Sequence, residues 1–341
     1  MLEGRKPADH PSVKPPKVGV LLLNLGTPDS PDYWPMRRYL GEFLSDRRVI
    51  ETNPVLWQLI LQGIILNVRP QKSGANYRKI WDREAGDSPL RVILRRQAEK
   101  LQAVLGEGVV VDFAMRYGNP STEVGIRALQ AAGCQKILLC PLYPQYSATT
   151  TATANDAAFD VLKTMRWQPA IRTLPPYCAT PDYVAALARS IADGVAALPF
   201  KPDVVLTSYH GMPIEYLIKG DPYYCDCLMT TRLVRETLGW SSDYLRVTFQ
   251  SRFGPDEWLK PYTDKTLMAL GAEKKKVAIL APAFSADCIE TLEELAITGR
   301  EQFVHAGGGH DDYAYIPCLN DSAVGMKMLE AVVRRELAGW I

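Results

Sequence analysis

Four histidines are the first candidates for chemistry in this chain of 341 residues, and their surroundings differ. His210 directly follows the apolar run 204–209 (VVLTSY), which predicts a buried strand. An imidazole there either satisfies a local hydrogen bond or faces a ligand, and its position leaves both interpretations open. His305 and His310 flank a run of three glycines in a predicted surface loop, which resembles a metal site but has no helix to align it. His10 lies in a polar N-terminal segment.

A second candidate is the acidic segment 284–295 (FSADCIETLEEL), which follows another apolar run, 277–281. Asp is a favourable helix N-cap, so we expect a helix that begins near Asp287. Asp287, Glu290 and Glu294 then stand at i, i+3 and i+7 and share one helical face. A solvent-facing acidic stripe is the ordinary alternative. Against it, the stripe begins beside a strand end, and its last acid lies too far along the helix to gain from the helix dipole.

The elements that must position these residues alternate between short apolar runs and helical patterns. Six runs rich in Val, Ile and Leu are continuous, as in parallel strands covered on both faces. The predicted strands are 18–24, 109–113, 136–142, 204–209, 244–249 and 277–281, and the predicted helices are 89–105, 121–132, 181–198, 226–238, 261–270 and 322–340. This alternation runs through the chain twice and predicts an α/β protein with open parallel sheets.

Ligands of such sheets bind outside the carboxyl ends of the strands. The loops at those ends carry Tyr, Arg and His, and none has the glycine pattern that holds a pyrophosphate. These side chains suit a large, flat, anionic aromatic ligand, because rings stack and cations bind carboxylates. If His210 and the acidic face meet in one cleft, they could hold a divalent metal weakly and accept protons near neutral pH.

The composition argues against several classes of protein. A net charge of +1 gives no field that would attract nucleic acid, so we expect no nucleic-acid partner. Seven scattered cysteines favour a reducing cytoplasm over a disulfide framework. Residues 1–16 lack the apolar core of a signal peptide, and we expect them to form a loose tail.

Residues 55–66 (VLWQLILQGIIL), called the lip below, are apolar nearly all round when read as a helix. A buried core helix is one interpretation. The other is a surface that rests on a membrane, since a helix of this length is too short to cross one.

Taken together, these stretches resemble the ferrochelatase family from about residue 17 to the C-terminus. The resemblance lies in LLLNLGTP, NYRKI, AMRYGNP, PLYPQYSATT, TSYHGMP, GDPYYCDC, FQSRFGPDEWLKPYT and FSADCIETLEEL, in this order. It implies a chelatase-like fold of two Rossmann-like domains, each with a parallel sheet flanked by helices. The first domain would hold residues 17–168, with the lip, and 320–341. The second would hold residues 169–319, with His210 and Glu290. The resemblance also favours membrane contact for the lip.

The resemblance implies roles for particular residues. His210 would face the porphyrin centre with Glu290 across from it, both as metal ligands, and Glu294 and Asp287 would continue a polar path as further catalytic residues. Substrate-binding residues would be Arg116, Tyr117 and Tyr143 on the opposite wall, Trp258 near the mouth, Leu25, and a set for the propionates comprising Arg69, Lys72, Tyr77, Ser88 and Ser251.

The activity implied is insertion of Fe²⁺ into protoporphyrin IX with release of two protons, which gives protohaem in the last step of haem synthesis. We hypothesise that His210 takes a pyrrole proton, that Glu290 and Glu294 pass protons or iron along, and that the cleft bends the ring to expose its nitrogen lone pairs. The implied location is the cytoplasm, at the inner face of the cell membrane, with transient contact to the preceding oxidase of the pathway.

We expect no tightly bound cofactor, and in particular no [2Fe–2S] cluster. Ala148 stands where cluster-bearing members have a cysteine, and no cysteine follows Cys318. Cys225 and Cys227 supply only two of the roughly four thiolates that a cluster needs. Cys288 stands where some members have a second histidine, and we assign it no role.

Three alternatives differ in ligand or class. The nearest is a chelatase of the same fold that acts on coproporphyrin, or on a corrin-type ring with cobalt or nickel. A two-lobed protein that binds haem without catalysis would not need the acidic face. A nucleotide-sugar transferase is disfavoured by the missing glycine-rich phosphate loop.

Overall fold

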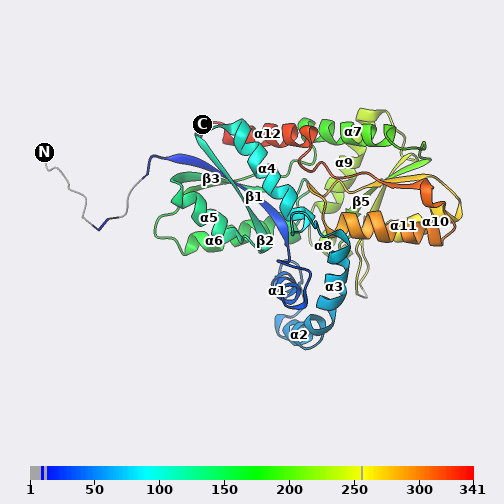
Figure 1. Ribbon diagram of the computed structural model, residues 1–341, viewed down its shortest axis with the longest axis horizontal. Coiled ribbons are helices and arrows are strands. Elements are labelled where there is room, and N and C mark those ends of the chain that lie inside the picture. The colour runs from blue at the N-terminus through cyan, green and yellow to red at the C-terminus, as the bar shows by residue number, and fades with distance from the viewer. Residues whose placement is uncertain (1–8, 11–13, 255) are drawn as a thin grey trace.

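The computed structural model describes residues 9–10, 14–254 and 256–341, so much of the expected tail 1–16 lies outside the described residues. Within them the chain forms two four-stranded parallel sheets that lie one beyond the other along the long axis (Figure 1). The strand order is β2-β1-β3-β4 in the first sheet and β6-β5-β7-β8 in the second. Both halves thus repeat one topology, as the doubled alternation in the sequence suggests.

In the first sheet, β1 (Lys17–Thr27) lies between β2 (Val109–Gly118) and β3 (Cys134–Pro141), and β4 (Ala170–Thr173) forms an edge. Nearly all of β1 is buried, because helices cover both faces of the sheet. The flanking helices are α4 (Pro89–Leu105), α5 (Thr122–Ala131), η2 (Ala148–Ala152) and α6 (Thr153–Lys163).

In the second sheet, β5 (Val204–His210) lies between β6 (Leu245–Gln250) and β7 (Val277–Leu280), with β8 (Tyr313–Tyr315) at one edge. The helical segments of this half are α7 (Pro181–Ala196), α8 (Ile214–Ile218), α9 (Tyr223–Leu238), α10 (Thr263–Ala272), η3 (Ile289–Gly299), α11 (Arg300–His305) and η4 (His310–Asp312). The carboxyl ends of β5 and β6 bring His210 opposite Gln250.

The predicted domain boundary at residue 168 is wrong. Residues 170–173 form β4, which pairs with β3 and belongs to the first sheet. β4 and β8 escape prediction because they are short edge strands of four and three residues with no apolar run of their own.

The two halves share one core. The last helix, α12 (Ala323–Leu337), packs on α4 of the first half and on α7, which leads into the second. A single apolar cluster contains Leu22 of β1, Leu329 of α12 and Leu280 of β7. In Figure 1, α12 and α7 lie along the same side of the molecule, across both sheets.

A helical projection (residues 33–80) extends from the first half (Figure 1). It consists of α1 (Tyr33–Leu44), α2 (Pro54–Ile60), η1 (Leu61–Ile65) and α3 (Leu66–Ile80), and its small core includes Met36, Tyr39, Leu61 and Leu66. The lip is not a buried helix along its whole length, because no residue of α2 is buried, although Leu61 and Leu66 beyond α2 are. Val55 and Leu59 expose 73% and 69% of their surface.

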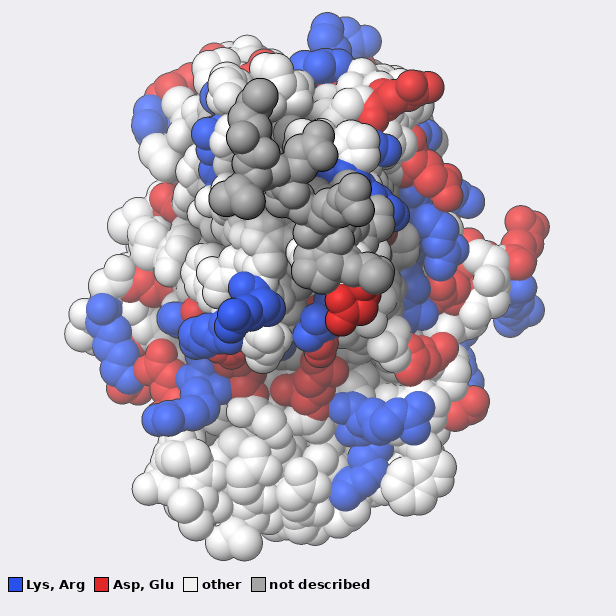
Figure 2. Space-filling view, turned by 90° about the vertical axis from the view of Figure 1, so that its left-hand side faces the viewer, with Lys and Arg blue, Asp and Glu red and all other residues white. Residues whose placement is uncertain are grey.

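Figure 2 shows this end of the molecule as a surface largely without charge, with Lys and Arg side chains along its margin. No helix in the described ranges is both long enough and apolar enough to cross a membrane.

We predict that Leu329→Ala destabilises both halves together, because its side chain belongs to the shared core. The expected loss is about 2–5 kcal/mol, as for other buried leucines. Urea unfolding, followed by tryptophan fluorescence and far-UV circular dichroism, should give one transition at a lower midpoint. Lys327→Ala, on the exposed face of the same helix, is the matched control. Two separated transitions would contradict a shared core.

Candidate functional site

His210 is the last residue of β5 and keeps part of its surface exposed. Its Nδ1 lies 2.7 Å from the carbonyl oxygen of Gly211. Because a carbonyl only accepts, this contact places the proton on Nδ1 and leaves the lone pair on Nε2. The imidazole is therefore held in the tautomer that can accept a proton or bind a metal through Nε2.

The acidic segment differs from its predicted geometry. The helix η3 begins at Ile289, with Cys288 as its N-cap, and is a π-helix with i→i+5 bonding. Asp287 precedes it and is buried, and its carboxylate accepts hydrogen bonds from Tyr315 Oη at 2.6 Å and Asn320 Nδ2 at 2.6 Å. The helix begins two residues after Asp287, near the expected start, but it is a π-helix, and the Asp287 carboxylate anchors the segment before it instead of joining the acidic face.

Glu290 and Glu294, in contrast, lie with His210 in one electrostatic group. Ser251 Oγ donates a hydrogen bond to Glu294 Oε2, and Gln250 Nε2 donates to the backbone carbonyl of Glu290 at 2.8 Å. Burial raises the pKa of Glu294, and the charge of Glu290 raises it further, against the opposing effects of Ser251 and His210. The structure thus brings the His210 imidazole together with two carboxylates that follow it by about 80 residues in the sequence.

Three buried tyrosines of the first half are affected by the charge of Glu290. Burial raises the pKa of Tyr39, Tyr77 and Tyr143, and the negative charge of Glu290 raises each pKa further. The hydroxyl of Tyr143 has no hydrogen-bond partner among the described residues. Sequence reasoning missed Tyr39, because it lies inside a helix of the projection, far from any strand end.

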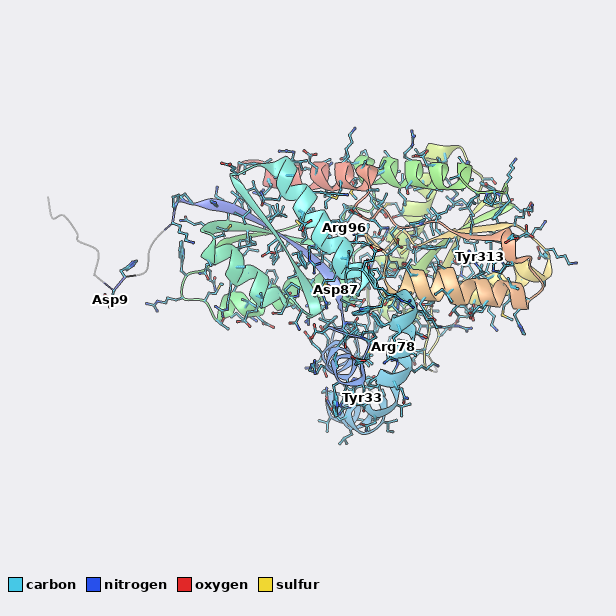
Figure 3. The ribbon with its side chains drawn as sticks, viewed as in Figure 1. Asp9, Tyr33, Arg78, Asp87, Arg96 and Tyr313 are labelled. Carbon is cyan, nitrogen blue, oxygen red and sulfur yellow. The ribbon has the colours of Figure 1, made fainter. Side chains whose placement is uncertain are left out.

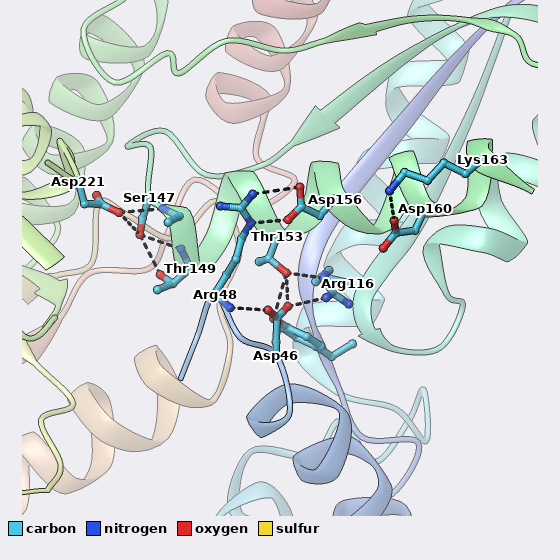
Figure 4. A network of polar contacts seen from close by, with 12 residues as sticks. Asp46, Arg48, Arg116, Ser147, Thr149, Thr153, Asp156, Asp160, Lys163 and Asp221 are labelled. Carbon is cyan, nitrogen blue, oxygen red and sulfur yellow. Dashed lines mark hydrogen bonds and ion pairs between the residues drawn. The ribbon is translucent and has the colours of Figure 1, made fainter. Parts of the chain in front are cut away.

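Arg116 and Tyr117 are held by a residue that the sequence did not single out, Asp46. Figure 4 shows Arg116 paired with the Asp46 carboxylate and donating to Thr153 Oγ1, at 2.6 Å. Tyr117 Oη donates to Asp46 at 2.8 Å. Burial opposes ionisation of Asp46, but hydrogen bonds from Thr153, the Arg48 N–H and Tyr117 outweigh it and lower the pKa. The Tyr117 side chain is fully buried, and its place on the cleft wall stays a prediction.

The residues expected to bind propionates do not form one group. Arg69 and Lys72 are exposed on α3, while Tyr77 is buried on the same helix. Ser88 is buried and caps α4 by accepting the N–H of Arg91. Ser251 binds Glu294 instead. The structure therefore gives two of the predicted propionate residues other partners, since a helix cap and a buried acid take up their hydroxyls.

Trp258 and Leu25 are the last two residues that the sequence predicts to bind the substrate. Trp258 is buried against Phe253, with ring centroids 5.0 Å apart, and its indole N–H has no partner among the described residues. The Arg69 guanidinium lies 5.9 Å from the centroid of the Phe253 ring. Leu25, near the end of β1, packs between the sheet core and the core of the projection.

Among the described residues, no three His, Cys, Asp or Glu side chains are arranged to hold a metal ion. His305 and His310 line one surface groove, but His310 contacts the neighbouring Asp311 rather than His305. Cys225 is exposed on α9 and Cys227 is buried in it. His210, Glu290 and Glu294 therefore form no such three-ligand set in the described part of the chain, and the role of His210 and Glu290 as metal ligands stays a prediction.

Structures of similar fold are SirB from Bacillus subtilis with Fe³⁺ (TM-score 0.56, 12% identity, covering 95% of this chain and 97% of that one) and the sirohydrochlorin chelatase SirB from Bacillus subtilis subspecies spizizenii with cobalt (TM-score 0.51, 10% identity, covering 94% of this chain and 95% of that one).

A family model for ferrochelatase matches residues 17–337. The ferrochelatase of Agrobacterium fabrum is 56% identical over 98% of both chains. That of Mesorhizobium japonicum is 58% identical over 98% of this chain and 95% of its own. This chain belongs to the ferrochelatase family, whose members insert iron into porphyrin in haem synthesis.

We predict that Glu294→Gln raises the thermal stability of the protein at neutral pH by about 1–3 °C. A carboxyl whose folded pKa is raised binds more protons when folded, so stability falls as pH rises above the ordinary glutamate pKa of 4.5. The amide cannot ionise, and the gain over the wild type should shrink toward pH 5. Glu301→Gln, at an exposed position, is the control for differential scanning fluorimetry. A gain that grows at low pH would contradict the raised pKa.

Proposed function

We propose that this chain inserts Fe²⁺ into protoporphyrin IX to give protohaem, in the region between its two halves that His210, Glu290 and Glu294 face. The observation that carries the proposal is an imidazole held with its lone pair on Nε2, in the same electrostatic group as two carboxylates, one of which has a raised pKa. Such a group can accept the two pyrrole protons that must leave when four nitrogens bind the metal.

In this proposal Nε2 of His210 takes the first pyrrole proton. The Nδ1–H bond to Gly211 keeps the ring in the required tautomer, and the carboxylates stabilise the imidazolium that forms. Glu294, with its raised pKa, then receives a proton more readily than an ordinary glutamate would, and the charge of Glu290 acts on both Glu294 and Tyr143 of the first half. The roles of Asp287, Arg116 and Tyr117 are structural here, since their hydrogen bonds go to other protein groups.

The unsatisfied polar atoms around the group also support a bound polar ring. The hydroxyl of Tyr143 and the indole N–H of Trp258 come from opposite halves and are both buried. Buried polar atoms without partners are uncommon, and a ligand or ordered water would satisfy them. A porphyrin held between the halves would be bent by this enclosure, which exposes its nitrogen lone pairs.

We further propose that the lip rests on the inner face of the cell membrane. There the protein would take up its apolar substrate and contact the preceding oxidase of the pathway. Val55, Leu56, Leu59 and Ile64 all expose more than half of their surface. Residues 52–81 contain no acidic side chain, so anionic headgroups would meet no repulsion there. The protein needs no tightly bound cofactor in this scheme, because iron is the substrate.

The main alternative within this fold is a preference for coproporphyrin. That ring carries more carboxylates and would be less soluble in a membrane than protoporphyrin. The exposed apolar lip therefore favours protoporphyrin as the substrate. Side-by-side rates of the wild-type protein with the two porphyrins decide between them, and faster turnover of coproporphyrin would overturn the assignment.

We predict that His210→Ala lowers the rate of Fe²⁺ or Zn²⁺ insertion by roughly 10²–10⁴-fold, because it removes the base, while protoporphyrin still binds. The measurement is the loss of free-porphyrin fluorescence with time. His310→Ala, an exposed histidine in the same chain, is the control and should keep the wild-type rate. Retention by His210→Ala of more than about a tenth of that rate would refute the base assignment.

We predict that Leu59→Glu weakens binding to vesicles of mixed neutral and anionic phospholipid, because a charge would enter an apolar surface that is 69% exposed. Trp57 is a poorer test, since its indole N–H donates to the Leu44 carbonyl and the substitution would disturb the fold. Vesicle flotation measures the effect, with Val124→Glu, an exposed position on α5 outside the projection, as the control. Equal flotation of both variants would argue against membrane contact through the lip.

A further inference from the structure

The acidic helix η3 carries a third glutamate that the proposed reaction does not use. Glu293 lies between Glu290 and Glu294 in the sequence, yet its side chain points elsewhere and is only 8% exposed. Its Oε1 accepts hydrogen bonds from Lys79 Nζ at 2.7 Å and from Thr298 Oγ1 at 3.1 Å. A buried carboxylate requires such partners, because desolvation of an unpaired charge is costly.

The cation comes from a different part of the molecule. Lys79 lies in the last turn of α3, the helix that joins the projection to the body, and it is 214 residues away from Glu293 in the chain. Its side chain is 43% exposed, so it loses little hydration when it pairs. The hydrogen bond that Lys79 donates to Glu293 raises the pKa of Lys79 and keeps the ammonium charged.

The same two helices meet at a second, apolar contact. Ile289, the first residue of η3, packs against the core of the projection, and α3 runs alongside η3. Tyr77 lies two residues before Lys79, and burial together with the charge of Glu290 raises its pKa. The ion pair and the apolar contact therefore fix η3 to the projection near its start and at its middle, on either side of Glu290.

We propose that the Lys79–Glu293 pair positions the acidic helix relative to the projection, so that Glu290 and Glu294 stay aligned with His210. A π-helix bonds i→i+5 and is intrinsically less favourable than an α-helix, so its geometry needs external support. Without Lys79, Glu293 would keep only the Thr298 hydroxyl and would turn toward water, which displaces the two working glutamates. The proposal rests on the proposed function and adds two positioning residues to it.

A neighbouring ion pair on the same helix supplies a matched control. Arg78 pairs with Asp32 at 3.6 Å, and both side chains are more than half exposed, so the pair contributes little. Figure 3 labels Arg78 on α3, between the body and Tyr33 on the projection. Arg78→Met therefore removes a charge one position away from Lys79 without touching η3.

The test compares Lys79→Met, Lys79→Arg and Arg78→Met in zinc insertion into protoporphyrin, with rates expressed per porphyrin-binding site. Lys79→Met should lower kcat by about tenfold to a hundredfold, because a displacement of about 1 Å has such effects, and should leave KM for porphyrin within about twofold. Lys79→Arg restores the charge and should keep at least about half of the wild-type kcat, and Arg78→Met should match the wild type. If Lys79→Met does not fold, Glu293→Gln carries the same expectation, because its amide retains the Thr298 bond and the volume of the side chain.

Two results would overturn the proposal. One is a Lys79→Met kcat within about threefold of the wild type, and the other is a Lys79→Arg variant as slow as Lys79→Met, which would indicate a purely local disturbance. Either result, with an active wild type, leaves the proposed function standing. An inactive wild type would instead reject the proposed function, and the positioning role with it.

Discussion

The electrostatic group formed by the His210 imidazole and the carboxylates of Glu290 and Glu294 is the arrangement on which the rest of this structure depends. Like charges that share such a site repel one another, and removal from water adds to the cost. Hydrogen bonds from Ser251 and Gln250, both at the end of β6, support the helix that carries these acids. Parallel strands make this possible, since their carboxyl ends deliver side chains to one edge of the sheet.

The interior elements were predictable because each carries its own signal. β5 is a continuous Val/Leu run that ends in His210, and α4 begins at Pro89 directly after the Ser88 cap. β4 and β8 were not predictable, because an edge strand of three or four residues is defined by the neighbour with which it pairs. The local sequence does not indicate which strand that neighbour is.

The site shows the same division. His210 and Glu290 follow strand ends and could be picked out, whereas Asp46 and Glu293 owe their roles to partners in distant segments. An α-helical spacing does not hold at Asp287, because this residue precedes the helix and the chain continues as a π-helix. Tyr117, near the end of β2, illustrates a second gap, since the sequence does not say whether a side chain there turns to the ligand or into the core, where it is buried.

The core shared through α12 also bears on how the protein is made. Residues 323–337 complete the packing around α4 and β3, which are built from the first 141 residues. During synthesis the N-terminal half therefore cannot complete its packing until the last helix has left the ribosome, and part of its apolar surface stays uncovered until then. A protein with this arrangement should depend on chaperones for most of its translation, and truncation after the second sheet would damage the first.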